Sequence, residues 1–325
     1  MNRDQEEMQL LGFVGVFQHS SQTILAERKT FSKITHILIL PLVFIFLLHT
    51  EVTATFQDSC ISRAAAIGQG SADASDTAIK ELANFLLIEF ACLVLVAILG
   101  LLSKSVVVYS VACIYTSKEV TFKGVMSVVP KVWKKLVVSF FCVFILFFAL
   151  TLATLFAVAI WLYVIGSNNA GVAGTCVLLM IYLVYVVYLS VICELAYTVS
   201  VLEDAQGFPA ISKSRRLMKG KIWLCVAVSL GLGIPMAVTN MAFKALVVKG
   251  SSIYWRISYG LVCVAVFSIA YLFALVAQTI TYLVCKSYHH EKIDKSELSD
   301  HLEVYTHEYV PLTSKAVQME NYDVV

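Results

Sequence analysis

The sequence predicts an all-α polytopic membrane protein: a helical bundle of about six transmembrane helices in repeated hairpins, with amphipathic helices at the cytoplasmic interface. Hydrophobic residues make up 59% of the 325 residues and charged residues only 14%, whereas soluble domains carry roughly 25% charged residues. The apolar residues also gather in windows long enough to span a bilayer, where a helix of about 20 apolar residues keeps every backbone group paired. A buried bundle in a soluble protein is the alternative, but the chain lacks the polar surface that it would need.

The predicted spans cover 34–50, 85–115, 136–165, 171–200, 222–248 and 255–285. They form a membrane domain over 32–286, between a cytoplasmic amphipathic segment at 1–31 and a polar tail at 287–325 that we expect to be disordered. The first window is short and contains Pro41, which usually kinks a helix. A re-entrant hairpin is therefore an alternative there. Mixed polar residues precede this window, so we expect an uncleaved internal anchor rather than a signal peptide.

The positive charges lie in alternate loops, and positive charge near the spans sets orientation. Most of the 24 lysines and arginines fall on one side: Arg3, Arg28, Lys29, Lys33, Lys118, Lys123, Lys131, Lys134, Lys135, Lys213, Arg215, Arg216, Lys219, Lys221, Lys286, Lys292, Lys295 and Lys315. The other side holds Arg63, Lys80, Lys244, Lys249 and Arg256, and Lys104 lies inside a span. This asymmetry places both termini in the cytoplasm. We expect the membrane to belong to the endomembrane system or to be the plasma membrane.

No cofactor or metal is predicted. His36, His289 and His290 lack further ligands at metal-binding spacing. No phosphate-binding glycine loop or nucleophile elbow occurs, so we expect no enzyme activity. The basic residues follow the topology, and no nucleic-acid partner is needed to explain them. Of nine cysteines only Cys60 lies in the large outer loop, which argues against disulfides; Cys285, at the membrane boundary, is either palmitoylated or simply embedded.

Amphipathic segments are predicted on the cytoplasmic side. Residues 5–30 place Met8, Leu10, Leu11, Phe13, Val14 and Phe17 at helical spacing. This helix lies either on the membrane leaflet or against the bundle itself. The second inner loop repeats the pattern over 122–131 and ends at Trp133, and the fourth does so from Pro209 to Trp223, with Ile211, Met218 and Ile222 as an apolar stripe. The first outer loop, roughly 51–83, is polar and predicts a partly helical or mobile cap.

Three ionisable residues fall inside spans, where charges are expensive and suggest function. They are Glu89, Lys104 and Glu194. Lys104 and Glu194 lie near the cytoplasmic ends of their spans and could pair, either as a salt bridge that locks two helices or as a site for a proton or solute. Glu89 lies one turn inside the outer interface, where we expect it to be solvated. Pro235 interrupts the fifth span, either as a packing kink or as a break of the kind found in transporters.

Short linear motifs occur near both ends. Glu6, Leu10 and Leu11 fit an acidic dileucine sorting signal, and Tyr309 with Leu312 and Tyr322 with Val325 fit tyrosine-based signals. Sorting adaptors are therefore candidate partners. Leu10 and Leu11 also belong to the apolar stripe of the N-terminal segment, which is a second explanation for them.

Two stretches resemble known proteins. EEMQLLGFVGVFQHSSQTIL, followed by FSKITHILILPLVFIFLLHTEV, resembles a family of plant multi-pass membrane proteins of unassigned activity, over nearly the whole chain. GFPAISKSRRLMKGKIW is similar to a segment of prokaryotic six-span membrane domains, some of them fused to glycerophosphodiester phosphodiesterases. The second resemblance implies kinship of fold only, because the soluble catalytic barrel has no counterpart here.

These observations favour an integral membrane protein without a catalytic site, which acts as a membrane scaffold or a lipid-organising component. Its partners would be the bilayer and, through the basic inner loops, anionic lipids. The alternative is a transporter or channel for a small solute or lipid that uses the region of Lys104 and Glu194.

Overall fold

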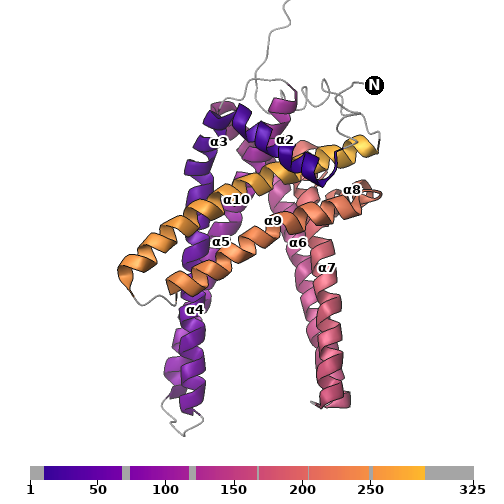
Figure 1. Ribbon diagram of the computed structural model, residues 1–325. Coiled ribbons are helices and arrows are strands. Elements are labelled where there is room, and N and C mark those ends of the chain that lie inside the picture. Colours follow the sequence, from indigo (N-terminus) through magenta and orange to yellow (C-terminus); the bar gives the residue numbers. More distant parts are fainter. Residues whose placement is uncertain are drawn as a thin grey trace, which may run out of the picture.

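The computed structural model describes residues 11–67, 74–116, 122–166, 168–203, 205–248 and 252–289, and this part of the chain is helical with no strand. The predicted all-α class is confirmed (Figure 1). The helices are α2 (Phe13–Ala26), α3 (Arg28–Ile34), η1 (Thr35–Ile39), α4 (Leu40–Ile67), α5 (Ala74–Tyr115), α6 (Phe122–Ile165), α7 (Asn169–Leu202), α8 (Phe208–Met218), α9 (Ile222–Phe243), η2 (Lys244–Val248) and α10 (Ile253–Tyr288), where η marks a π-helix.

Six helical segments are long and apolar enough to cross a membrane, and the protein is therefore an integral membrane protein. They are Arg28–Gln57, Ala83–Tyr115, Val132–Ile165, Asn169–Leu202, Ile222–Val248 and Ile253–Tyr288. Most of their side chains lie outside the protein core, as expected where lipid rather than protein covers an apolar surface.

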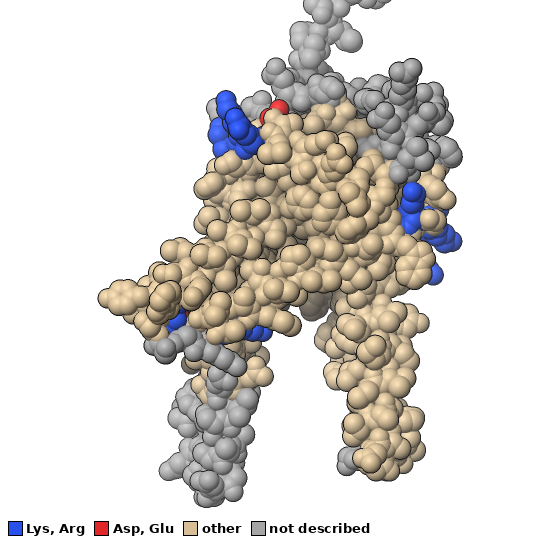
Figure 2. Space-filling model, viewed as in Figure 1, with Lys and Arg blue, Asp and Glu red and all other residues tan. Residues whose placement is uncertain are grey.

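The helices form two projecting columns and a body. The hairpin of α4 and α5 is one column and the hairpin of α6 and α7 the other, and both extend to the same side of the molecule (Figures 1 and 2). Helices α9 and α10 cross obliquely beside the columns, with α2 and α8 against them. The outer part of the second column is apolar on all sides, with Phe156, Tyr163 and Val184 exposed. A helix surface that is apolar all round is typical of a membrane span.

The core lies where the columns meet the body, and α10 is its central helix. From Leu272 onwards nearly every side chain of α10 is buried. Helices α2, α4, α5, α7, α8 and α9 all pack against α10. The largest fully buried side chains include Tyr282, Phe31 and Leu136. Burying a large apolar side chain contributes about 2 kcal/mol, so the second half of α10 anchors the fold.

The second inner loop differs from the prediction. Helix α6 runs without a break from Phe122 to Ile165, so the segment 122–131 is continuous with the helix of the span, which begins at Val132, and is not a separate helix. Pro130 lies inside α6. Trp133 is half-buried against the core, so the start of the span is packed on the protein as well as exposed to lipid. The second loop therefore contains no separate helix comparable to the one in the fourth loop, and whether 122–131 lies at the membrane interface stays a prediction.

The region 51–83 is partly helical, which is one of the two alternatives expected for it. Helix α4 continues to Ile67 and α5 begins at Ala74, so helix occupies both ends of the region 51–83. Alanine-rich sequence favours helix even when it is polar. The first span is one continuous helix beyond Pro41, not a re-entrant hairpin. The π-helical turn Thr35–Ile39 ends two residues before Pro41, and such a turn accommodates the hydrogen bond that proline cannot donate.

Helix α2 packs against the bundle. Phe17 lies 5.4 Å from Phe273 of α10, between ring centroids, and Phe13 covers Gly231 of α9. The buried side chains are Val16, Ser20 and Thr23, whereas Val14, which we placed on the apolar stripe, is exposed. The segment was expected to lie either on the membrane leaflet or against the bundle, and its described residues lie against the bundle. The face that packs differs from the predicted apolar stripe, because Val16 is buried and Val14 is exposed.

Helix α8 is a separate helix, as expected for the fourth loop, with Pro209 in its first turn. Its buried face consists of Ala210, Ser214, Leu217 and Met218. Ile211 of the predicted stripe is only half-buried and Trp223 is largely exposed. Gly220 allows the sharp turn into α9 because its φ of +91° is rarely adopted by other residues, and Tyr288 fills the space beside it.

Candidate functional site

A cavity of about 470 Å³ opens where α5, α6, α7, α9 and α10 meet. Its size is typical of sites for small molecules, which are concave and mostly apolar with a few polar groups. The lining consists of Val96, Ala97, Gly100, Leu101, Lys104, Phe140, Val143, Phe147, Ser190, Cys193, Glu194, Tyr197, Met236, Tyr271, Ala274, Leu275 and Gln278. Lys104 and Glu194, singled out from the sequence, line the same cavity.

Lys104 is held at the cavity wall by two neighbours. Its side chain is only 9% exposed. Its Nζ donates a hydrogen bond to Gln278 Oε1 of α10 at 3.2 Å and lies 5.0 Å from the ring centroid of Tyr197 on α7. The ring face attracts the cation. An ammonium has three N–H donors, so further donors remain for an acceptor in the cavity.

Glu194 has a different set of neighbours. Ser229 of α9 and Lys104 of α5 are the polar side chains that act on its carboxylate. No direct ion pair joins Glu194 to Lys104 in the part of the chain that the structure describes. A carboxylate can accept several hydrogen bonds, so Glu194 keeps unused acceptor capacity beside the cavity. The two charges are thus close but separate, and a ligand with both a donor and an acceptor could bind between them.

The apolar lining gives the cavity its second property. Val96 and Leu101 of α5 and Phe147 of α6 offer hydrocarbon surface, and Met236 of α9 adds a flexible side chain. Met236 directly follows Pro235, so the proline of the fifth span adjoins the cavity. The helix itself continues through Pro235. The site therefore combines a charged end with an apolar wall, which suits an amphiphile.

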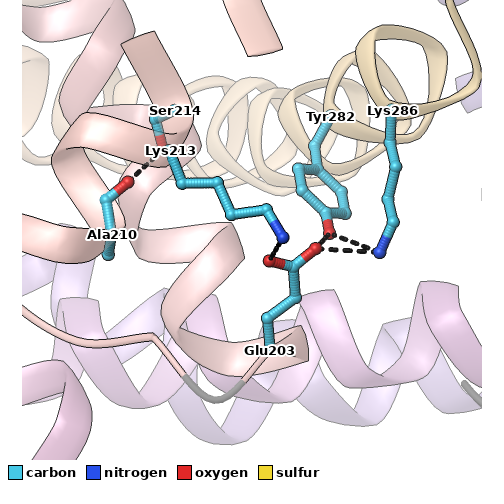
Figure 3. A network of polar contacts seen from close by, with 6 residues as sticks. All are labelled: Glu203, Ala210, Lys213, Ser214, Tyr282 and Lys286. Carbon is cyan, nitrogen blue, oxygen red and sulfur yellow. Dashed lines mark hydrogen bonds and ion pairs between the residues drawn. The ribbon is translucent and has the colours of Figure 1, made fainter. Parts of the chain in front are cut away.

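A second polar cluster lies at the end of α7, centred on Glu203 (Figure 3). Its Oε2 pairs with Lys213 Nζ of α8 at 2.6 Å. Its Oε1 accepts from Lys286 Nζ at 2.8 Å and from the Tyr282 hydroxyl at 2.7 Å, both of α10. Burial raises the pKa of Glu203, but the hydrogen bonds from Lys213, Lys286 and Tyr282 lower it more, so its pKa lies below the ordinary 4.5. This cluster joins three helices.

Further contacts seat α8 beside this cluster. Ser139 of α6 bonds Ser200 of α7 at 2.8 Å, and its Oγ accepts the Gly207 N–H at 2.9 Å. Gly207 has a φ of +64°, which favours glycine. At the other end of α8, His289 Nε2 lies 3.0 Å from the Leu217 carbonyl oxygen. Helix α8 is thus fixed at both ends by polar contacts.

Glu89 lies in neither cluster. Its Oε1 is 2.9 Å from His49 Nε2, and Thr53 Oγ1 donates to it at 3.3 Å. These contacts hold α4 and α5 together in the first column. Nearby, Glu51 of α4 pairs with Arg256 of α10. The expectation that Glu89 is simply solvated is therefore replaced by a paired, half-exposed carboxylate.

The candidate sorting residues are mostly outside the described residues, namely Glu6, Leu10, Tyr309, Leu312, Tyr322 and Val325. Leu11 is half-buried against the core. Cys285 is fully buried, with its Sγ 3.4 Å from Cys225 Sγ. Cys285 was expected to be either palmitoylated or simply embedded, and full burial agrees with the embedded thiol. Within the described ranges no three His, Cys, Asp or Glu side chains are grouped to hold a metal.

Glu203 and Tyr197 were missed as site residues. Glu203 directly follows a span, so its sequence position predicts solvent rather than partners. The lysines that pair with it, Lys213 and Lys286, were counted only as topology signals. Ring contacts such as that of Tyr197 with Lys104 leave no mark in a single sequence, because they depend on how α5 and α7 pack.

Searches of curated proteins and of solved structures return no match to the chain. A family model described as a domain of unknown function, DUF8558, matches residues 1–322. The protein is therefore a member of the DUF8558 family.

Proposed function

We propose that this membrane protein binds an amphiphilic lipid in the cavity of Lys104 and Glu194, and so organises lipid in the bilayer. The observation that carries the proposal is the pairing of an open, mostly apolar cavity with two charges that keep unused hydrogen-bonding capacity. Charged groups inside a membrane are costly unless they serve a purpose or are fully paired. The role is one of binding and includes no catalytic step.

The two charges specify the head of the ligand. Lys104 suits a phosphate or carboxylate, and Glu194 suits an ammonium or another N–H donor. A single-chain lipid with a zwitterionic head satisfies both, and its chain would lie along the wall formed by Val96, Leu101 and Phe147. The basic end of the molecule faces the cytoplasm in this proposal, because positive charge is retained on that side.

Binding of lysophosphatidylethanolamine to the purified full chain, measured by native mass spectrometry, tests the proposal. Lys104→Met and Glu194→Gln should each weaken binding about tenfold or more, since a hydrogen bond to a charged group contributes about 1.5–3 kcal/mol. Glu89→Gln is the matched control and should leave binding unchanged, because Glu89 contacts His49 and Thr53 away from the cavity. Equal binding by all of these proteins would refute the proposal.

Transport of the same lipid is a second candidate function. It is favoured by the position of Met236, which lines the cavity next to a proline in α9. Its neighbour Pro235 removes a hydrogen bond in α9, and proline sites in transporter helices often adjoin the substrate. Proteoliposomes with fluorescent lysophosphatidylethanolamine in one leaflet would detect transport as loss of fluorescence after a membrane-impermeant quencher is added. Transport requires faster exchange in the wild type than in Glu194→Gln. A role in binding alone predicts equal exchange.

A further inference from the structure

Helix α3 carries a group of exposed cations that the cavity does not use. Arg28, Lys29 and Lys33 line a shallow surface depression together with Ser32. All four side chains are exposed. The basic patch over α3 stands apart from the one near α8 in Figure 2. We name Arg28, Lys29, Ser32 and Lys33 the α3 patch.

The cations of the α3 patch are not used by the fold. No carboxylate within the described ranges forms an ion pair with Arg28, Lys29 or Lys33. Glu27 is adjacent in sequence and half-buried, and it pairs with none of them. The basic residues around α8 differ, because Lys213 binds Glu203 and Lys221 lies over the Tyr288 ring. Around α8 the positive charge is thus partly compensated, although Arg215 and Lys219 form no ion pair with a described residue, whereas none of the three cations at α3 is paired within the same ranges.

The α3 patch is at the end of an exposed apolar ridge. On the same side of the chain follow the exposed side chains of Ile37, Leu40, Phe44 and Leu48, spaced by three or four residues. This spacing keeps them on one helical face. The patch and the ridge belong to one candidate span, Arg28–Gln57. Cations at the end of a lipid-facing ridge are at the level of the phosphates when the ridge contacts acyl chains.

We propose that the α3 patch is a binding site for one anionic phospholipid. The phosphate is bound by Arg28, which can donate two parallel hydrogen bonds, and by Lys29 and Lys33. Ser32 donates a further hydrogen bond from its hydroxyl. The acyl chains lie along Ile37, Leu40 and Phe44. A zwitterionic lipid binds less well, because its own cation is repelled by the patch. This inference does not rest on the cavity of Lys104 and Glu194.

The test uses the full chain in a lipid-free detergent, titrated with phosphatidylglycerol or phosphatidylcholine and followed by native mass spectrometry. The variant Arg28→Gln, Lys29→Gln, Lys33→Gln should bind the first phosphatidylglycerol at least about tenfold more weakly, because each surface cation attracts an anionic lipid. Phosphatidylcholine binding should not change. The variant Arg28→Lys, Lys29→Arg, Lys33→Arg keeps the charge and should retain most of the binding.

The matched control removes the same charge elsewhere. Lys134, Arg215 and Lys219 are exposed, and none forms an ion pair in the described part of the chain. Changing all three to Gln should leave the affinity for the first phosphatidylglycerol within about twofold of that of the wild type. If the control and the α3 variant lost affinity for phosphatidylglycerol equally, the loss would follow from the change in net charge alone, and the proposal would be overturned. Displacement of the lipid by an equal concentration of glycerol 3-phosphate would also overturn it, because the site would then bind soluble phosphate.

Discussion

Two glutamates near the same end of α7 have opposite surroundings. Glu203 is bound by Lys213, Lys286 and Tyr282 through both carboxylate oxygens. Glu194 has only Ser229 and Lys104 as polar neighbours and lines an open cavity together with Lys104. A carboxylate whose two oxygens both contact cations fixes helices, whereas one with free capacity can bind a ligand. The number of unused hydrogen-bonding positions therefore separates the structural site from the candidate binding site.

The largest effect expected from this comparison is at Glu203. Glu203→Gln removes the negative charge that compensates Lys213 and Lys286, and breaking such a buried pair destabilises a protein by about 3 kcal/mol. Thermal unfolding in detergent should show a clearly lower Tm. Glu27→Gln removes a half-buried carboxylate that has no ion pair, and it should leave Tm nearly unchanged. A Glu203→Gln protein as stable as the wild type would show that the cluster is not structural.

The next effect concerns the seat of α8. Ser139→Ala deprives the buried Gly207 N–H of its acceptor and Ser200 of one of its two partners, while the Ser200 hydroxyl still donates to the Ala196 carbonyl. Leaving a buried N–H unsatisfied costs about 2 kcal/mol, so the free energy of unfolding should fall by that order. Ser21→Ala is the control, since the Ser21 hydroxyl bonds only the Gln18 carbonyl of its own helix on an exposed face. If Ser139→Ala were as stable as Ser21→Ala, Ser139 would not be needed to hold α8 in place.

A smaller effect appears with pH. The pKa of Glu203 is lower in the folded protein than the ordinary 4.5, so its stabilising contribution is complete above that value. The contribution is lost as the pH falls through the folded pKa, because the protonated acid no longer pairs with the lysines. Tm measured from pH 7 to pH 3 should therefore fall more in the wild type than in Glu203→Gln. If Tm fell equally with pH in the two proteins, the loss of stability in acid would come from other carboxylates.

Much of this fold could be predicted from the sequence, because lipid imposes simple rules. Apolar windows of sufficient length predicted six long helices, and those helices are present. The errors lie where tertiary packing overrides local pattern. Val14 fits an apolar stripe, yet α2 turns Val16 towards α10 instead. The segment before Trp133 has the spacing of an interfacial helix, but it continues into α6.

The sites were predicted less well than the fold. Lys104 and Glu194 stood out because a charge inside a span is rare. Which neighbours they have could not be known, since Tyr197, Ser229 and Gln278 come from three different helices. Glu203 gave no signal at all, because an acidic residue just after a span is ordinary. Its importance comes only from the approach of α8 and α10.

The smallest effect on stability is expected at the cavity, and it is the sharpest test of the comparison. The double variant Lys104→Met, Glu194→Gln removes both charges together and leaves neither uncompensated. Replacing charged groups by neutral ones of similar size is often neutral or slightly stabilising, so Tm should change by less than the equivalent of about 1 kcal/mol. Lipid binding should nevertheless be lost, because both contacts to the head are gone. If the double variant were as unstable as Glu203→Gln, Lys104 and Glu194 would hold the helices together, and the cavity would no longer qualify as a binding site.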